Sequence, residues 1–221
     1  MKTKYFSLIV MTAGVISLGI IFSQISIDSE SINLDINRKI GTVDTSLGSP
    51  MLGTSDAPIT IIEFGDYQCS NCKKWFLNTK PDIVTNYIDT GKVNLVFVDI
   101  AFLGKDSGPA SIATYCAEDQ GRYWDYHGFL YSNQLSIDNG WANSDSLKGY
   151  ANNLGLNMEM FVSCLDSEKY SKRVQFNTNE AQRNGVTGTP TFFIIGPNGE
   201  QEKIVGPQPY PVFEKIIESM I

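Results

Sequence analysis

One stretch of the chain, residues 59–72, decides the fold, and it reads ITIIEFGDYQCSNC. Its first six residues are mostly β-branched or aromatic, which is typical of a buried strand, and Gly65 ends the run. Cys69 and Cys72 then open a segment in which large apolar residues recur at helical spacing. The stretch therefore predicts a strand that turns directly into a helix, with a Cys-Ser-Asn-Cys motif at the turn.

The elements after this stretch alternate between strand and helix patterns. In the first helix Pro81 predicts a kink and Gly91 a C-terminal stop, and residues 93–98 form a second β-branched run. The helices expected next have Ser107, Ser144 and Ser167 as N-caps and Gly121, Gly155 and Gly185 as stops. The middle of the chain is therefore predicted to be an all-helical block at about residues 104–184.

The strand pattern returns near the C-terminus. Residues 191–195 and 202–205 read as two strands around a turn at residues 196–199, and residues 210–220 read as a final helix. The order β-α-β, then helices, then β-β-α predicts an α/β fold. Its sheet is of the thioredoxin type, with the helical block inserted in the middle.

Composition limits the classes of function. The 221 residues are 42% hydrophobic and 19% charged, which fits one globular domain with terminal extensions rather than a disordered chain. The net charge is −7, and the part after the N-terminal apolar run carries 15 basic and 24 acidic side chains, or −9. Such a surface repels phosphate backbones, so binding to nucleic acid is disfavoured.

Residues 5–27 contain no charged side chain and, as a helix, would span roughly 35 Å, enough to cross a bilayer core. Lys2 and Lys4 precede this segment and favour a cytoplasmic N-terminus. An uncleaved membrane anchor and a cleaved export signal both fit the segment, and its length favours the anchor. Either way, residues 28–48 read as a polar linker, and residues 49–221 are expected to form an extracytoplasmic domain.

The four cysteines are read in that exported setting, where disulfides form and persist. A zinc site is disfavoured because the Cys69–Cys72 pair lacks two further ligands and His127 is the only histidine. A cysteine at the start of a helix meets unpaired backbone N–H groups and the positive end of the helix dipole, which favour its thiolate. We therefore predict Cys69 as the exposed nucleophile and Cys72 as the buried resolving thiol. A static disulfide or an inert reduced pair is the alternative.

Three segments carry a resemblance to a known family. They are Phe64–Cys72 (FGDYQCSNC), Tyr115–His127 (YCAEDQGRYWDYH) and Gly185–Thr191 (GVTGTPT). Together, in this order and around a helical block, they resemble the DsbA-like thiol:disulfide oxidoreductases of the thioredoxin superfamily over residues 50–221. The resemblance implies a thioredoxin-like fold, a dithiol activity at Cys69 and Cys72, and a cis-proline loop.

The resemblance also implies roles for residues around the pair. Pro190 after Thr189 matches the cis-proline loop that faces the cysteines, with an ordinary turn proline as the alternative. Glu63 matches an acidic residue beneath the active site that exchanges protons with Cys72. Burial would raise the pKa of Glu63, whereas a place on the other face of the sheet would leave it in water.

Ser70 and Asn71 separate the two cysteines, where well-known members of the family often carry Pro and His. Without an imidazolium inside the motif, only backbone dipoles and polar side chains support the Cys69 thiolate. A less stabilised thiolate makes the reduced form less favourable. The motif therefore predicts a weaker oxidant.

Cys116 and Cys164 are predicted to form a structural disulfide. Four cysteines allow three pairings, and a redox role for Cys69 and Cys72 leaves only this one. Small residues beside Cys116 and apolar residues beside Cys164 favour close approach of two buried helix faces. Two free buried thiols are the alternative.

These features predict an exported, membrane-anchored enzyme that exchanges its Cys69–Cys72 disulfide with client protein thiols, as an oxidase in disulfide bond formation. The resemblance implies that a membrane quinone-linked oxidase, DsbB-like or vitamin-K-epoxide-reductase-like, reoxidises it. A membrane-fed reductase or isomerase is the alternative, and a Cu(I)-delivery module is less favoured because no Met or His lies near the pair. His127 is interpreted as a structural residue of an aromatic-rich helix, and no bound cofactor is implied.

Overall fold

The computed structural model describes residues 39–40 and 43–221, and the structural statements below concern these residues. The membrane segment predicted over residues 5–27 and most of the predicted linker lie outside them. Within the described residues, no helix combines the length and the apolar character needed to cross a bilayer.

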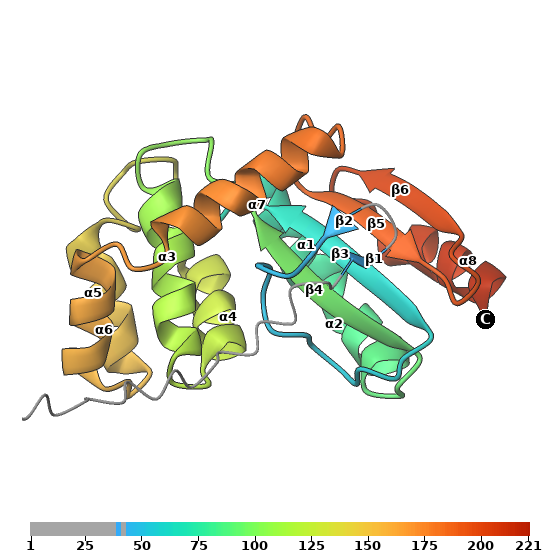
Figure 1. Ribbon diagram of the computed structural model, residues 1–221, viewed down its shortest axis with the longest axis horizontal. Coiled ribbons are helices and arrows are strands. Elements are labelled where there is room, and N and C mark those ends of the chain that lie inside the picture. The colour runs from blue at the N-terminus through green and yellow to red at the C-terminus, as the bar shows by residue number, and fades with distance from the viewer. Residues whose placement is uncertain (1–38, 41–42) are drawn as a thin grey trace, which may run out of the picture. The chain divides into compact units, whose positions relative to one another are not determined.

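A four-stranded sheet in the order β4-β3-β5-β6 forms the centre of the domain (Figure 1). Its strands are β3 (Ile59–Gly65), β4 (Val93–Asp99), β5 (Thr191–Ile195) and β6 (Gln201–Val205). β4 runs parallel to β3, whereas β5 is antiparallel to β3 and β6 to β5. A separate ribbon pairs β1 (Lys39–Ile40) with β2 (Val43–Asp44). The mixed sheet and its order of elements confirm the predicted thioredoxin-like α/β fold.

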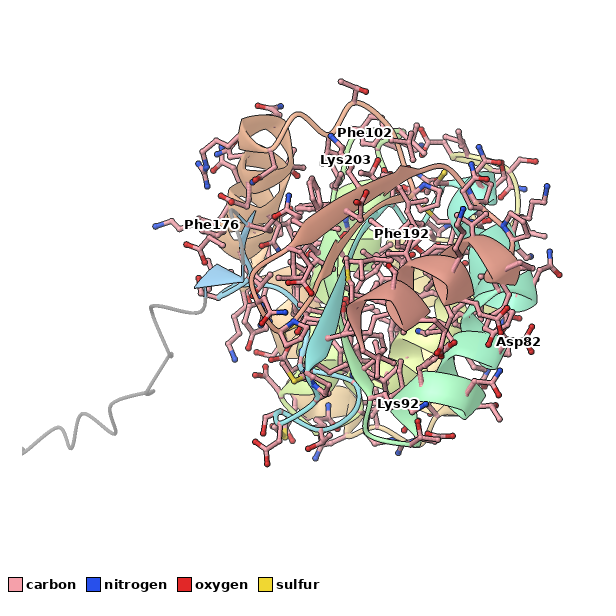
Figure 2. All side chains as sticks on the ribbon, turned by 90° about the vertical axis from the view of Figure 1, so that its right-hand side faces the viewer. Asp82, Lys92, Phe102, Phe176, Phe192 and Lys203 are labelled. Carbon is pink, nitrogen blue, oxygen red and sulfur yellow. A yellow bond between two sulfur atoms is a disulfide. The ribbon has the colours of Figure 1, made fainter. Side chains whose placement is uncertain are left out.

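Helices α1 (Ser70–Asn78), α2 (Lys80–Ile83) and α8 (Tyr210–Met220) pack on one face of the sheet. Trp75 of α1 and Phe213 of α8 both contact Phe192 of β5, with ring centroids 4.6 and 5.0 Å from that of Phe192. Figure 2 shows Phe192 in the interior and Asp82 of α2 at the edge of the molecule. Burial of these rings holds α1, and with it the cysteine motif, against the sheet.

The helix after the cysteines is interrupted, as Pro81 predicts. α1 ends at Asn78, and Pro81 lies in the first turn of α2. A π-helix, η1 (Val84–Ile88), continues α2, and Gly91, with a φ of +74°, turns the chain towards β4. Because proline has no N–H to donate to the preceding turn, the regular helix cannot continue through it.

The opposite face of the sheet is covered by α7 (Ser171–Arg183), which crosses from the other helices to the sheet (Figure 1). Ile62 and Phe64 of β3 point to this face and belong to the same apolar cluster as Ala181 of α7. Their neighbours along the strand, Ile61 and Glu63, point to the face covered by α1 because side chains alternate along a strand. Both faces of β3 are therefore buried.

Helices α3 to α6 pack together beside the sheet and lie between β4 and β5 in the sequence (Figure 1). Their bounds are α3 (Ser107–Glu118), α4 (Tyr123–Asn133), α5 (Ser144–Asn153) and α6 (Met158–Asp166). Cys116 of α3 and Cys164 of α6 form a disulfide, with their Cα atoms 5.7 Å apart. The disulfide joins two helices of a block whose aromatic-rich core also includes Tyr67 and Phe97.

The three predicted serine N-caps are wrong, whereas the three predicted glycine stops are correct. Ser107 and Ser144 are the first helical residues rather than caps, and Ser167 follows the end of α6. The side chains of Asn143 and Asn157 cap α5 and α6 instead, because each accepts a backbone N–H of the first turn. The glycine stops were placed correctly: Gly121, Gly155 and Gly185 have φ values of +69°, +69° and +62°.

The chain packs on the domain earlier than the predicted start at residue 49. Val43 is completely buried. The carbonyl of Leu47 accepts hydrogen bonds from Arg173 Nε at 2.9 Å and Asn177 Nδ2 at 2.8 Å. Residues 43–48 are therefore part of the folded domain and not of a linker. Their polar composition hid this because backbone carbonyls, rather than side chains, make much of the contact.

Candidate dithiol active site

The cysteine motif lies where the turn after β3 enters α1. Cys69 is the N-cap of α1, with an extended backbone (φ −79°, ψ 115°), and its carbonyl accepts the N–H of Lys73 at 3.1 Å. Its sulfur therefore lies at the positive end of the helix, next to the N–H groups of the first turn. Cys72 follows one turn later and is completely buried.

Cys69 is less exposed than the sequence predicts, since only 8% of its surface is accessible. Two residues from other parts of the chain contact it. Gln134 Nε2 donates to the Cys69 carbonyl at 3.0 Å, and the Cys69 thiol donates to the Thr189 carbonyl at 3.3 Å. Cys69 is nevertheless the more accessible residue of the pair, which is the order that its predicted role as nucleophile requires.

The two thiols differ strongly in acidity. The pKa of Cys69 falls from its usual 9.0 to about 6, because the Cys72 thiol, the side chain of Thr189 and backbone N–H groups of the first turn favour the thiolate and outweigh the opposing effect of burial. Burial raises the pKa of Cys72 well above its usual value, and the hydrogen bond between the Cys72 thiol and Cys69 raises it further. Near neutral pH the pair therefore holds a thiolate on Cys69 and a proton on Cys72.

The loop predicted from the resemblance lies against the motif. The peptide bond between Thr189 and Pro190 is cis, and the Thr189 carbonyl is the acceptor for the Cys69 thiol. Ser70 and Asn71 are exposed between the two cysteines. A polypeptide that approached Cys69 would therefore meet these two residues and the loop.

Two side chains that the sequence analysis missed fix the turn that carries Cys69. The buried carboxylate of Asp66 accepts the N–H of Gln68 at 2.8 Å and the hydroxyl of Ser107 at 2.9 Å. Gln134 Nε2 donates to the carbonyls of Tyr67 and Cys69. The turn after β3 is thus tied to both α3 and the end of α4. No local signal in the sequence distinguishes these residues from surface polar residues.

Glu63 lies on the face of β3 that α1 covers, and only 1% of its surface is accessible. Burial raises its pKa to about 8; the positive charge of Lys80 opposes this shift and the charge on Cys69 adds to it. Neither carboxylate oxygen has a hydrogen-bond partner among the residues that the structure describes. The carboxyl group is therefore buried with a raised pKa, which is the environment that its predicted role in proton exchange requires.

Lys80 is a further buried residue that the sequence analysis missed. Its Nζ lies 3.3 Å from Nε2 of His127, which is itself buried among aromatic rings as interpreted from the sequence. A signal was present: Lys80 stands four residues after Phe76, in register with the apolar face of the helix. Because lysine side chains are usually exposed, this spacing did not lead to a prediction that Lys80 is buried.

These residues together can exchange disulfides with other thiols. A helix-capping thiol with a lowered pKa, a shielded second thiol one turn on and a buried carboxyl group are the kinds of group that thiol–disulfide exchange can use. In the part of the chain that the structure describes, no three His, Cys, Asp or Glu side chains are placed to hold a metal ion. Fold and site therefore define a thiol:disulfide oxidoreductase.

Known proteins agree with this class. The sequence profile of the thioredoxin family matches residues 45–219. Disulfide bond formation protein D of Bacillus subtilis (strain 168) is 33% identical over 150 residues, which are 66% of this chain and 68% of that protein. The chain belongs to the thioredoxin family and, within it, to the DsbA-like protein-disulfide oxidoreductases.

Solved structures show the same likeness. Oxidised BdbD from Bacillus subtilis superposes with a TM-score of 0.73 and 30% sequence identity, over 81% of this chain and 96% of that one. The α-DsbA1 protein of Wolbachia pipientis superposes with a TM-score of 0.67 and 25% identity, over 77% and 89% of the two chains. The likeness therefore includes the helical block as well as the sheet.

Proposed function

We propose that this enzyme oxidises thiols of exported client proteins with a disulfide between Cys69 and Cys72. The observation that carries the proposal is the asymmetry of the pair, in which Cys69 caps α1 with a pKa lowered to about 6 while the pKa of Cys72 is raised. A stabilised thiolate favours the reduced state of the pair, so the oxidised state readily passes its disulfide to a client.

The reaction follows from the order of accessibility. A client thiolate attacks Cys69, the Cys69–Cys72 bond breaks, and Cys72 leaves as a thiolate that takes a proton from Glu63. A second client thiolate then attacks the client sulfur of the mixed disulfide, and Cys69 leaves as the thiolate that its helix position stabilises. Two electrons pass from client to enzyme. The backbone beside Thr189 and Pro190 offers hydrogen-bonding groups to an extended client.

The direction of exchange is tested by the equilibrium of the Cys69–Cys72 pair with glutathione. Because Ser70 and Asn71 bring no imidazolium to the motif, we expect a potential between about −120 mV, the DsbA value, and about −270 mV, the thioredoxin value. Quantifying the oxidised fraction by alkylation and mass spectrometry gives the result. A potential at the thioredoxin end would overturn the oxidase proposal in favour of a reductase or isomerase.

The same proposal places the domain outside the cytoplasm. Relatives named for disulfide bond formation support this, as do the uncharged residues 5–27, which we propose as a membrane anchor. A membrane quinone-linked oxidase of the DsbB-like or vitamin-K-epoxide-reductase-like kind would then reoxidise the pair. Full-length protein should remain in membranes after a carbonate wash, with its domain open to protease from outside. A soluble form that starts after residue 20 would show a cleaved signal instead.

A further inference from the structure

The residue before the nucleophile, Gln68, has a buried side chain with no part in the reaction described so far. Only 1% of Gln68 is accessible. Its Nε2 donates to Asp138 Oδ1 at 3.0 Å and to Ser107 Oγ at 3.1 Å. Its Oε1 accepts the backbone N–H of Asp138 at 2.7 Å. Gln68 and Asp138 are therefore joined by two hydrogen bonds, although they are 70 residues apart in the chain.

Asp138 lies in the loop after α4 and binds a second loop as well. Its Oδ2 accepts the N–H of Lys105 at 3.1 Å, and its Oδ1 accepts that of Asp106 at 3.2 Å. The hydrogen bond from Gln68 and those from these two N–H groups lower the pKa of Asp138, so its carboxylate is ionised at neutral pH. One carboxylate thus connects the loop before α3, the loop after α4 and the turn that carries Cys69.

The backbone on both sides of this contact is adapted to it. Asp138 has a φ of +54°, a left-handed conformation that is unfavourable for residues with a side chain. A Cβ atom at Gly104 would lie 2.5 Å from Asp138 Oδ1 and 2.6 Å from Gln68 Nε2. Gly104 is not one of the described glycines with a positive φ, so this close approach is what requires a glycine there. Two loops therefore take special backbone features where they meet Gln68.

The loop after α4 holds the turn of the nucleophile at two consecutive residues. Gln134, at the start of the loop, donates to the Cys69 carbonyl at 3.0 Å, and Asp138, at its end, binds the side chain of the residue before Cys69. Between them, Leu135 and Ile137 are 62% and 48% exposed, so burial of apolar surface contributes little to the position of this loop. Polar contacts at its two ends therefore fix the loop and the turn relative to each other.

We propose that Gln68 and Asp138 are positioning residues that keep the Cys69 sulfur aligned with the N–H groups of the first turn of α1. This inference rests on the proposed function of the cysteine pair. Cys69 is the N-cap of α1, so the direction of its sulfur depends on the backbone that Gln68 anchors. If that backbone moved, fewer N–H groups would face the thiolate, and the reduced form of the pair would become less favourable.

The experiment compares Asp138→Gly with the wild type. Glycine keeps the left-handed backbone and its N–H but removes the carboxylate. Brief iodoacetamide treatment at a series of pH values measures the midpoint of Cys69 alkylation, which should rise by about 0.5–1 pH unit as the thiolate loses hydrogen bonds. Equilibration with glutathione at pH 7 should shift about threefold to fivefold towards the protein disulfide. Removal of a negative charge alone would instead lower the midpoint, so the sign separates positioning from electrostatics.

Further variants make the result specific. Asp138→Asn keeps a residue that tolerates the left-handed backbone and a side-chain acceptor for Gln68, so its midpoint should not rise. Glu168→Gly is the matched control, because Glu168 is the other described residue besides glycine with a positive φ, +51°, and it follows α6. Gln68→Met should raise the midpoint as Asp138→Gly does, and the double variant should show no larger shift than either single one.

The outcomes separate the two proposals. A wild type whose pair does not exchange with glutathione would overturn the function proposed for Cys69 and Cys72. An exchanging wild type with an unchanged or lowered midpoint in folded Asp138→Gly would overturn only the positioning role, even if the melting temperature falls. Equal shifts in Asp138→Asn or Glu168→Gly, or additive shifts in the double variant, would do the same. If Gln68→Met does not fold, the exposed position of Asp138 still allows the decisive comparison.

Discussion

The two cysteine pairs lie in different regions of the molecule and differ in chemistry, although their exposure is similar. Cys69 is 8% accessible and Cys164 is 6% accessible. Cys69 begins α1, at the positive end of that helix, whereas Cys116 and Cys164 lie in the last turns of α3 and α6, at the negative ends. The comparison teaches that position along a helix, rather than burial alone, separates a reactive thiol from a structural one.

The two cysteine pairs also differ in how far apart their members lie in the sequence. Cys69 and Cys72 are three residues apart at the start of one helix and are free thiols in the structure, so a disulfide between them would close a very short loop. Cys116 and Cys164 are 48 residues apart and connect two helices. In the loop-entropy account, a link of this length restricts the unfolded chain by about 4 kcal/mol. One pair is therefore suited to repeated opening and the other to permanent closure.

Removing the nucleophile should have the largest effect. Cys69→Ser should lower the rate of client oxidation at least about a thousandfold, because no thiol at the helix start remains to attack or be attacked. Cys72→Ser should instead accumulate mixed disulfides with clients, visible on non-reducing gels. Oxidation of a reduced model protein measures the rate. The double variant Cys116→Ala/Cys164→Ala is the control, and an equal loss there would contradict the division of roles.

Removing the structural bridge should have the next largest effect, on stability. The variant Cys116→Ala/Cys164→Ala should lose about 4 kcal/mol of unfolding free energy, or less if the unfolded chain keeps residual structure. Urea titration of the oxidised protein, followed by tryptophan fluorescence, measures the change. Iodoacetamide reactivity of Cys69 in the reduced form should stay as in the wild type. A loss below about 1 kcal/mol would show that the bridge contributes little to stability.

The third prediction concerns how the reactivity of the Cys69 thiol depends on pH, and its expected effect is smaller than the first two. In the reduced native protein, alkylation of Cys69 should follow a midpoint near pH 6, with Cys72 unreactive. A pKa below that of the unfolded chain means that Cys69 stabilises the reduced fold fully above about pH 9, and that this contribution is lost as pH falls through 6. Peptide mapping after brief iodoacetamide treatment tests this. Equal labelling of both thiols would refute the assignment.

The smallest expected effect concerns the side chain that ties the turn of Cys69 to the end of α4. Gln134→Ala removes two hydrogen bonds to the carbonyls of Tyr67 and Cys69 and should cost about 1–2 kcal/mol of stability. Gln120→Ala, which removes bonds to Asn157 at the surface, should change stability by less than about 0.5 kcal/mol. Thermal unfolding of both variants makes the comparison. Equal losses would mean that the active-site turn does not depend on α4.

Strongly patterned elements were predictable from the sequence. The β-branched run at residues 191–195 and the amphipathic pattern at residues 210–220 coincide with β5 and α8 in the structure. Their patterns are short, continuous and bounded by Gly or Pro, so local chemistry suffices to define them. The cysteine motif was found for the same reason, because its neighbours in sequence are also its neighbours in space.

Features that depend on distant contacts were not predictable in this way. Gln134 reaches Cys69 across 65 residues, and Leu47 meets Arg173 across 126. Lys80 departs from the expectation that lysine lies at the surface, and only the ring faces and the imidazole around it explain its burial. The sequence therefore predicted the cysteine pair and Glu63, whereas the side chains that hold the turn of Cys69 and the burial of Lys80 became apparent only in the structure.

The bridge between α3 and α6 also bears on how a new molecule matures. Cys116 and Cys164 are 1% and 6% accessible once the helices have packed, so an oxidant can reach them only before folding is complete. Under the proposed function, each new copy is therefore a substrate for oxidation as well as an oxidant. If older copies perform that oxidation, biogenesis is autocatalytic, and cells that start without the protein should accumulate mature molecules only after a lag.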